Sequence, residues 1–376
     1  MKLSKVIAFI AIALIVLVFW PLGALAFEDN DPLPQLETDI ARGRIIQVSE
    51  MEEIPDDWFF TGRQLVTVEI TSGRFRGHVE EIENFLTGIP FRDLVLQEGD
   101  HVLLFLELDE GRLHSVNIYD IARDRYIYIL VAMFSGAVIL VGGLKGIKSL
   151  ITLAIMGLVI VFWLLPLILQ GHNPLLLTIL FASLITLVTL FIVGGINSKS
   201  LSATVGAIGG LLVAGLVAWV FGNAARLTGF SSEEAQLLQF ADLPRAIDIR
   251  GLLFSGIIIG ALGAVLDVAM SISSSVAEIR AANPLLGGRG LFQAGFRVGR
   301  DILGTMVNTL ILAYAGGALP LLLLFMAYDL SFMRIINMDL IATEVVRSLA
   351  GSFGLLTAIP LTAIAAAIFA GRRKKP

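Results

Sequence analysis

The apolar positions of this chain form long uninterrupted runs, and the polar positions are gathered between the runs. In the C-terminal part of the chain, successive runs reach the ~20 residues that an α-helix needs to cross the hydrocarbon core of a bilayer. The pattern predicts an all-α polytopic membrane bundle over residues 126–370. The expected spans are Tyr126–Leu144, Ile147–Leu169, Leu175–Gly194, Leu201–Gly222, Gly251–Glu278, Gly299–Ala327 and Ser348–Ala370.

Another apolar run lies near the N-terminus, from Val6 to Trp20. It ends in Ala24-Leu25-Ala26, which fits the small-x-small pattern of a signal-peptide cleavage site. The run is also long enough for an uncleaved signal anchor, the interpretation that we favour for residues 1–26. The anchor gives 8 transmembrane helices and cleavage leaves 7, and either outcome exports the segment that follows.

Between these two regions, hydrophobic and polar positions alternate with a period of two, the pattern of half-buried strands. Residues 27–36 form an acidic linker with two prolines, and residues 37–123 form an extracytoplasmic all-β domain. Strands are expected at Arg44–Val48, Gln64–Ile70, Phe75–Glu83, His101–Leu108 and Leu113–Ile121. Short antiparallel strands of this spacing indicate a small OB-like barrel. Three histidines lie on different strands, so we expect no metal site there: His78, His101 and His114.

Composition agrees with a membrane protein, because 56% of the residues are hydrophobic and only 16% are charged. The chain has no cysteine, which excludes disulfides and thiolate metal ligands. The only dense basic stretch, in the tail 371–376, is short and adjacent to a span, so we expect no nucleic-acid partner.

The basic residues gather in alternate connections between the spans. The expected inner connections hold Lys145, Lys148, Lys199, Arg280, Arg289, Arg297 and Arg300. The outer connections hold fewer basic residues, mixed with acids. By the positive-inside rule, both termini are cytoplasmic and the β domain is outside. If the first segment is cleaved, the new N-terminus lies outside.

The stretch 251–315 carries most of the polar groups expected inside the membrane. At 100° per residue, one helix stripe holds Gly256, Gly260, Gly263, Asp267, Ser271, Ser274 and Glu278. The next helix has a stripe of Asp301, Thr305, Asn308, Leu312 and Ala315. Glycines allow close approach of a neighbouring helix, and Gly206 and Gly210 of an earlier span offer a matching surface. We expect the two polar stripes to pack against each other or against a third helix.

An acid inside a spanning helix costs ~2.5–3.5 kcal/mol on insertion scales, so Asp267 is the main candidate for function. In one interpretation, the stripes line a path for an ion or solute. Asp267 and Glu278 then bind a cation or proton, Ser271, Ser274, Thr305 and Asn308 are polar lining, and Arg300 and Asp301 gate the inner mouth. Alternatively, the hydroxyls and Asn308 hold helices together, Asp267 is structural or reaches headgroup water, Arg300 is a positive-inside anchor, and Asp301 favours the helix dipole.

The residues that common membrane enzymes need are missing. No His-Glu-x-x-His motif exists, and the one histidine beyond the β domain, His172, lies in an outer turn. Gly287-Gly288-Arg289-Gly290 lacks the lysine and hydroxyl of a phosphate-binding loop. An aspartyl intramembrane protease needs two embedded acids, whereas Asp301 stands at a helix start beside Arg300. We therefore expect neither enzymatic activity nor a cofactor.

Two motifs carry a resemblance to a known family. They are GAVLDVAMSISSSVAE at Gly263–Glu278 and GRDILGTMVNTLILAY at Gly299–Tyr314. With them, the chain resembles the YibE/YibF-type bacterial multi-spanning membrane proteins over roughly Tyr126–Ala370, and the layout of N-terminal span, outer β domain and bundle is similar too. The resemblance implies a bacterial plasma-membrane protein of loosely permease-like character, and it implies no catalytic residues.

Together these features predict a transporter or channel for an ion or small solute, with its path between helices 251–278 and 299–327. The alternative is a sensor or an assembly or scaffold protein whose outer β domain binds a partner, and a further alternative is one subunit of a larger permease. The lipid bilayer is the one certain partner, and the glycine-rich faces permit a homo-oligomer or a membrane partner protein without requiring either.

Overall fold

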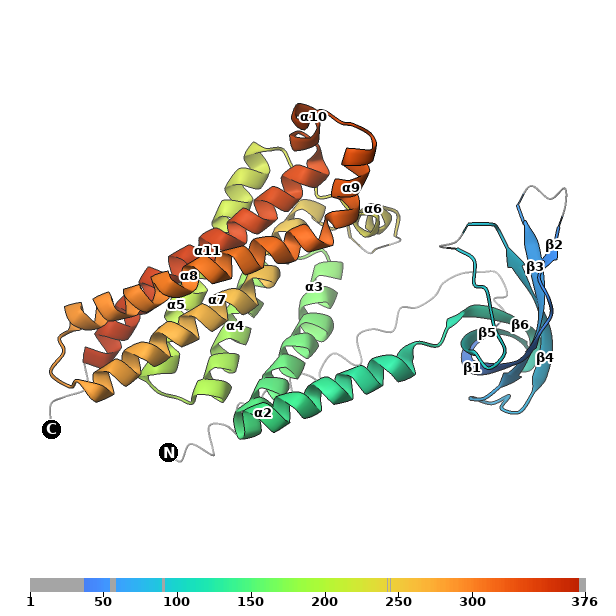
Figure 1. Cartoon of the computed structure of the whole chain (residues 1–376), viewed down its shortest axis with the longest axis horizontal. Coiled ribbons are helices and arrows are strands. Elements are labelled where there is room, and N and C mark those ends of the chain that lie inside the picture. Colours follow the sequence, from blue (N-terminus) through green and yellow to red (C-terminus); the bar gives the residue numbers. More distant parts are fainter. Residues whose placement is uncertain (1–36, 55–58, 90–91, 242, 244, 372–376) are drawn as a thin grey trace. The chain divides into compact units, whose positions relative to one another are not determined.

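The computed structural model describes residues 37–54, 59–89, 92–241, 243 and 245–371 (Figure 1). The predicted signal segment, the linker 27–36 and the basic tail beyond residue 371 lie outside these residues. The described chain forms two compact units. One holds the β-sheet and the start of the first helix, and the other begins at Val138 and holds the remaining helices.

The N-terminal unit is a small antiparallel sheet. Its strands are β1 (Glu37–Val48), β2 (Glu52–Glu53), β3 (Gly62–Ile70), β4 (Val79–Leu86), β5 (His101–Asp109) and β6 (Arg112–Ile121). The strand order is β2-β3-β1-β5-β6, and β4 pairs with β3. A closed barrel of the OB type would need β4 to pair with β6. The strands of the described chain show no such ladder, so barrel closure stays a prediction.

Two strands begin four or more residues away from the expected position. β1 begins at Glu37, because its polar first half pairs with β5 from Glu37 opposite Leu108 onward. Pairing with a neighbour thus outweighs the low strand propensity of this segment. β4 begins at Val79 and not at Phe75, because Gly73 and Gly77, at φ 79° and 88°, bound a turn there. Val102, Leu104 and Leu106 of β5 face the core, as the period-two pattern predicts.

The second unit is helical. Its elements and the helix that leads into it are α2 (Asp124–Val159), η2 (Ile160–Leu164), α3 (Leu165–Leu169), α4 (Pro174–Gly194), α5 (Ser198–Ala224), α6 (Glu233–Phe240), α7 (Ile249–Ala282), α8 (Gly288–Gly317), α9 (Leu319–Ala327), α10 (Phe332–Ile336) and α11 (Asp339–Gly371). Among the described residues, 5 helices are long and apolar enough to cross a membrane, or 6 if α8 and α9, bent by 59°, form one span.

The stretch from α2 to α3 accounts for one span of the difference from the predicted number of spans, and the break between α8 and α9 accounts for another. The α2 to α3 stretch is a single apolar segment of 46 residues, where the sequence predicts two spans joined at Lys145–Lys148. A straight helix of this length would measure about 70 Å, roughly twice the hydrocarbon thickness. Gly143 breaks the helix with φ 54° and ψ −134°. A Cβ on Gly146 would collide with the carbonyl oxygen of Val138, so the chain bends sharply here. Two spans in this stretch remain a prediction.

Other helix boundaries also needed correction. The predicted connection 279–298 is only residues 283–287, because α7 continues to Ala282 and α8 begins at Gly288. The predicted span Gly299–Ala327 is interrupted at Ala318, where α9 begins with Pro320 in its first turn. The last helix begins at Asp339, nine residues before the expected Ser348, and contains Pro360 without ending there. In the loop before α7, Ser231 and Glu234 predict a capping box for a short helix Glu233–Phe240. α6 has these bounds, but the side chain of Ser232 accepts the N–H of Ala235 as its cap.

Glycines bring the central helices close together. Figure 1 shows α5, α7, α8 and α11 side by side in the bundle. Gly206 of α5 lies directly against Thr362 of α11, and a Cβ on Gly210 would lie 2.6 Å from the carbonyl oxygen of Gly354. Because glycine lacks a side chain, the backbones of α5 and α11 come into contact here. The buried core of the unit extends from this contact along α7.

Candidate functional site

The polar stripe of α7 lies on the outer side of the bundle. Its positions Gly256, Gly260, Gly263, Asp267 and Glu278 are exposed, and Ser271 and Ser274 are half-buried. The opposite side of the same helix is buried against other helices, with Val265, Val268, Ala269 and Ile272 among the most buried residues of the chain. The stripe therefore faces away from the packed core along most of the length of α7.

The glycines of this stripe have few neighbours. Nothing lies within 4 Å of a Cβ placed on Gly256 or Gly263. Gly260 is different, because the hydroxyl of Tyr314 on α8 occupies the space beside it. Gly206 and Gly210 of α5 were expected to pack against this stripe, but they lie against Thr362 and Gly354 of α11. In the described chain, Gly260 has a close neighbour, whereas Gly256 and Gly263 face open space.

Asp267 lies near the middle of the bundle and not at its edge. Its neighbour in sequence, Val265, packs 3.2 Å from the Cβ position of Gly210. Gly210 is near the midpoint of α5, and the residue that it contacts, Gly354, is near the midpoint of α11. Asp267 is two residues from Val265, about 3 Å along the helix axis. In a bilayer, the carboxylate would therefore lie within the hydrocarbon region.

The polar stripe of α8 also points away from the core. Asp301, Thr305 and Asn308 are exposed, as is Arg300, while Gly295, Gly299 and Leu310 on the other side are buried. Two contacts fix the register of α8 against α7. Gly299 lies against Ile272, and Tyr314 lies against Gly260, so the two helices are antiparallel. The register places Thr305 and Asn308 at the level of Asp267.

The same register places Arg300 near the serines of α7. On α7, a spacing of seven residues joins Gly260, Asp267 and Ser274. On α8, read toward its N-terminus, the same spacing joins Tyr314, Val307 and Arg300. Residues seven apart lie on nearly the same side of a helix. Because Tyr314 meets Gly260, the antiparallel pairing brings Arg300 to the level of Ser274. One polar surface thus carries an acid at mid-depth and an arginine about two turns away.

The charged groups of this surface have no partners in the part of the chain that the structure describes. Asp267, Arg300, Asp301 and Glu278 form neither a hydrogen bond nor an ion pair with another described residue. By contrast, Thr305 donates to the carbonyl oxygen of Ile302 at 2.9 Å. The charges are therefore left for solvent, a solute or another chain to satisfy.

Tyr314 belongs to this surface, although the sequence pattern did not single it out. Its hydroxyl is buried and has no hydrogen-bond partner among the described residues. The ion pair of Arg347 with Glu344, at 2.8 Å, is close enough to interact with it electrostatically. The seven-residue spacing from Arg300 through Val307 to Tyr314 is the signal that would have identified it.

The described residues contain no group of three or more His, Asp or Glu side chains that could hold a metal ion. In the β domain, His78 is hydrogen-bonded to Glu80 at 2.9 Å.

Comparison with known proteins identifies a relationship over most of the helical part. A family model described as YibE/F-like protein matches residues 130–372, which is more than half of the chain. The match includes both motifs that carry the polar stripes. No curated protein and no solved structure matches the chain.

Proposed function

The chain belongs to the YibE/F-like family and is a membrane protein with several apolar helices, and from this premise we propose that it is a permease for a cation or a small cationic solute. The path runs along the polar surface of α7 and α8. The observation that carries the proposal is the exposed, unpartnered Asp267 at mid-depth of the bundle. An ionised or neutral acid at such a depth is costly, and its common use is to bind a transported ion or proton.

The neighbouring side chains suit this role. At the level of Asp267, α8 offers the hydroxyl of Thr305 and the amide of Asn308, and Ser271 lies one turn further along α7. Oxygen atoms of carboxylate, hydroxyl and amide groups replace the hydration shell of a hard cation. Arg300 lies toward the end that we assign to the cytoplasm, where its positive charge regulates entry together with Asp301 and Glu278. The proposed activity is transport and involves no covalent chemistry.

One chain does not enclose such a path, because both polar stripes face outward. A second copy closes it in our proposal. The exposed side of α7 carries the acids Asp267 and Glu278, and the exposed side of α8 carries Arg297 and Arg300 beside the acid Asp301. Two copies facing each other bring acids of one opposite arginines of the other. Exposed glycines at Gly256 and Gly263 allow the partner helix to approach closely.

The proposal is tested by flux measurements in proteoliposomes. Purified wild type is compared with Asp267→Asn, which keeps the size and hydrogen-bonding capacity of the side chain and removes the charge. Asp329→Asn in the loop after α9 serves as a matched control, because Asn tolerates the positive φ of 47° at that site. Proton, Na⁺, K⁺ and Mg²⁺ gradients are imposed in turn, and uptake is followed with ion-sensitive dyes.

We expect wild type and Asp329→Asn to conduct the same ion. The ion flux of Asp267→Asn should be at least tenfold lower, with unchanged folding. A well-folded wild type that conducts none of these ions would contradict the proposal. Equal flux in all three proteins would place the path elsewhere.

A second candidate function rests on the β domain. Several large apolar side chains of its outer surface are exposed, among them Ile40 at 59% and Tyr119 at 63%. A hollow of about 510 Å³ is lined by Phe59, Phe60, Thr87, Ile89 and Arg92. These features favour a domain that binds a partner outside the membrane, as a sensor or assembly protein would. Affinity capture with the full chain, with and without Ile40→Asp, separates this function from transport.

A further inference from the structure

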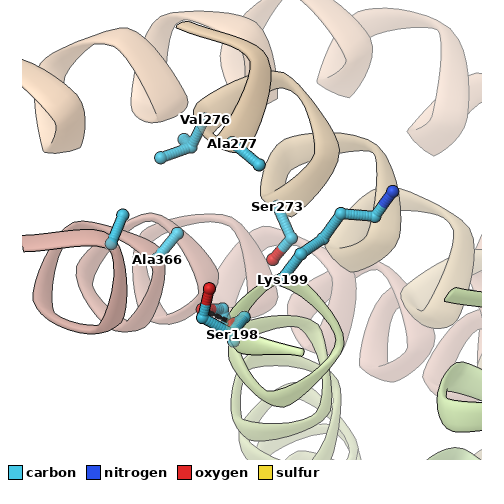
Figure 2. A pocket seen from close by; sticks show the side chains of 8 residues that line it. Ser198, Lys199, Ser273, Val276, Ala277 and Ala366 are labelled. Atoms are coloured by element: carbon cyan, nitrogen blue, oxygen red, sulfur yellow. Dashed lines mark hydrogen bonds between the residues drawn. The ribbon is translucent and has the colours of Figure 1, made fainter. Parts of the chain in front are cut away.

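A small cavity lies at the start of α5 (Figure 2). Its lining residue Ser273 is on α7, about 9 Å along the helix axis from Asp267. The volume of the cavity is about 10 Å³, which is room for one water-sized group. The polar lining comes from Ser198, Lys199 and Ser202 of α5 and from Ser273 of α7. Alanine and valine side chains of α7 and α11 complete the wall, and no lining side chain is acidic.

The hydroxyl of Ser273 lacks a partner in this cavity. Ser273 is 1% exposed, and its Oγ makes no hydrogen bond with any described residue. Figure 2 shows the hydroxyl turned toward the start of α5. Buried hydroxyls are nearly always hydrogen-bonded in folded proteins, so an unpartnered one that faces a cavity indicates a bound group.

The start of α5 supplies further donors. The first N–H groups of a helix have no acceptor within the helix. Asn197 accepts the N–H of Ser200 at 2.9 Å, which leaves the N–H groups of Ser198 and Lys199 without an acceptor in the described chain. A helix of 27 residues also carries a partial positive charge at this end, which favours anions.

Lys199 adds a full positive charge. Its side chain is half-buried, extends past Ser273, and forms no ion pair with any residue that the structure describes (Figure 2). Two serine hydroxyls and the free N–H groups of the helix start border the cavity, no acidic side chain does, and the Lys199 side chain brings a positive charge past Ser273 (Figure 2). The cavity therefore suits an oxygen atom that carries negative charge.

We propose that this cavity binds a phosphate group, with one phosphate oxygen inside it. The oxygen accepts hydrogen bonds from Ser273 and from the start of α5, and Lys199 balances its charge. The cavity lies at the end of the bundle where α5 begins and where α7 and α11 approach their C-terminal ends. This level suits the headgroup phosphate of a lipid as well as free phosphate from the aqueous phase.

Thermal stability measurements separate these two sources. The full chain is purified in a glycoside detergent, which contains no phosphate, and delipidated. It is titrated with sodium phosphate and, separately, with dihexanoyl phosphatidic acid, and the shift in Tm is recorded. Ser273→Ala and Lys199→Gln test the site. Thr186→Val removes a buried, unpartnered hydroxyl away from the cavity, and Lys145→Gln removes an exposed charge elsewhere, so both are matched controls.

We expect wild type and both controls to be stabilised at the same ligand concentrations. The half-saturating concentration should rise about tenfold or more in Ser273→Ala and Lys199→Gln, the loss expected for one hydrogen bond to a charged group. A response to both ligands identifies a general phosphate site, and a response to the lipid alone identifies a headgroup site.

Three results would overturn the proposal: no shift with either ligand, equal shifts in all five proteins, or the same shift with sodium chloride at equal ionic strength. Unfolding does not imitate the expected result. Without ligand, Ser273→Ala should be at least as stable as wild type, because it removes a buried hydroxyl that had no partner.

Discussion

Gly210 of α5 and Gly354 of α11 lie face to face. A Cβ on Gly210 would come within 2.6 Å of the carbonyl oxygen of Gly354, and a Cβ on Gly354 within 2.9 Å of the carbonyl oxygen of Gly210. Both distances are shorter than real Cβ contacts allow, and both obstacles are backbone atoms that have no other position to take. The contact is therefore one that only glycine permits on either helix.

Replacing Gly354 by alanine should destabilise the bundle by about 1–3 kcal/mol, the usual cost of inserting a methyl group into a packed interior. Gly157→Ala is the control, because nothing lies within 4 Å of a Cβ at Gly157. Thermal unfolding in detergent should show a lower Tm for Gly354→Ala and no decrease for Gly157→Ala. Equal Tm values for both variants would mean that α5 and α11 lie further apart than described.

The outward glycines of α7 predict contact with a second copy. The natural chain has no cysteine, so a single introduced cysteine reports on its own position. Gly263→Cys should form disulfide-linked dimers in membranes after mild oxidation, because the polar stripes of two copies face each other. Leu184→Cys, on an exposed apolar position of α4, should not. The measurement is the fraction of dimer on a non-reducing gel.

If Leu184→Cys cross-links as readily as Gly263→Cys, random collisions explain the dimers and the proposed interface is wrong. If neither cross-links while wild type transports, a different chain must close the path.

The hydrogen bonds of Asp93 predict that the local stability of the β domain depends on pH. Burial raises the pKa of its carboxyl, but hydrogen bonds from the N–H and hydroxyl of Thr87, at 2.6 and 2.7 Å, and from Gly88 and Ile89 together bring the pKa below its ordinary value. A carboxyl with a lowered pKa in the folded state stabilises the fold above its unfolded pKa of about 3.9, and this contribution is lost as pH falls through the folded pKa.

Amide hydrogen exchange of the segment around Thr87, corrected for intrinsic rates, should therefore show protection at pH 6 that declines below about pH 4. Asp93→Asn should have weak protection at both pH values. Asp109→Asn, at an exposed strand end, should behave like wild type. Unchanged protection in Asp93→Asn would show that Thr87 is held by other contacts.

The structure and the sequence pattern assign different serines as the N-terminal cap of α6. The sequence suggests Ser231 with Glu234 as a capping box, whereas Ser232 accepts the N–H of Ala235 at 3.2 Å. Ser232→Ala should cost about 1 kcal/mol of local stability. Faster exchange of the α6 amides is expected for Ser232→Ala and not for Ser231→Ala. The opposite order would favour the capping box.

The sequence could predict that Asp267 lies within a polar stripe, but it could not predict whether the stripe faces the core of the bundle or its outside. Residues such as Gly260, Asp267 and Ser274 recur at helical spacing, which the sequence shows directly. In a membrane protein, however, the core side and the lipid side of a helix are both apolar, so hydrophobicity does not say which side faces in. Only the contacts of Val265 and Ile272 with other helices reveal that the stripe faces out.

The boundaries that the sequence missed have similar physical causes. The first turns of α8 contain Arg289 and three glycines and resemble a loop, but the helix continues because Leu291 and Gly295 pack against the bundle. Glu37–Gly43 of β1 is polar, and its strand depends on a partner that is distant in sequence. Contacts with segments distant in sequence determine where α8 and β1 begin, and the periodicity of the sequence carries no information on such contacts.

The contact of Gly210 with Gly354 has a consequence for any movement of solutes. No channel runs between two helices whose backbones touch. Opening one would require α5 and α11 to move apart at this buried contact. In the described chain, no solute therefore passes between α5 and α11 at this level. In our proposal, gating would come from sliding or rotation of the outer helices against a neighbouring copy, while the contact of Gly210 with Gly354 stays unchanged.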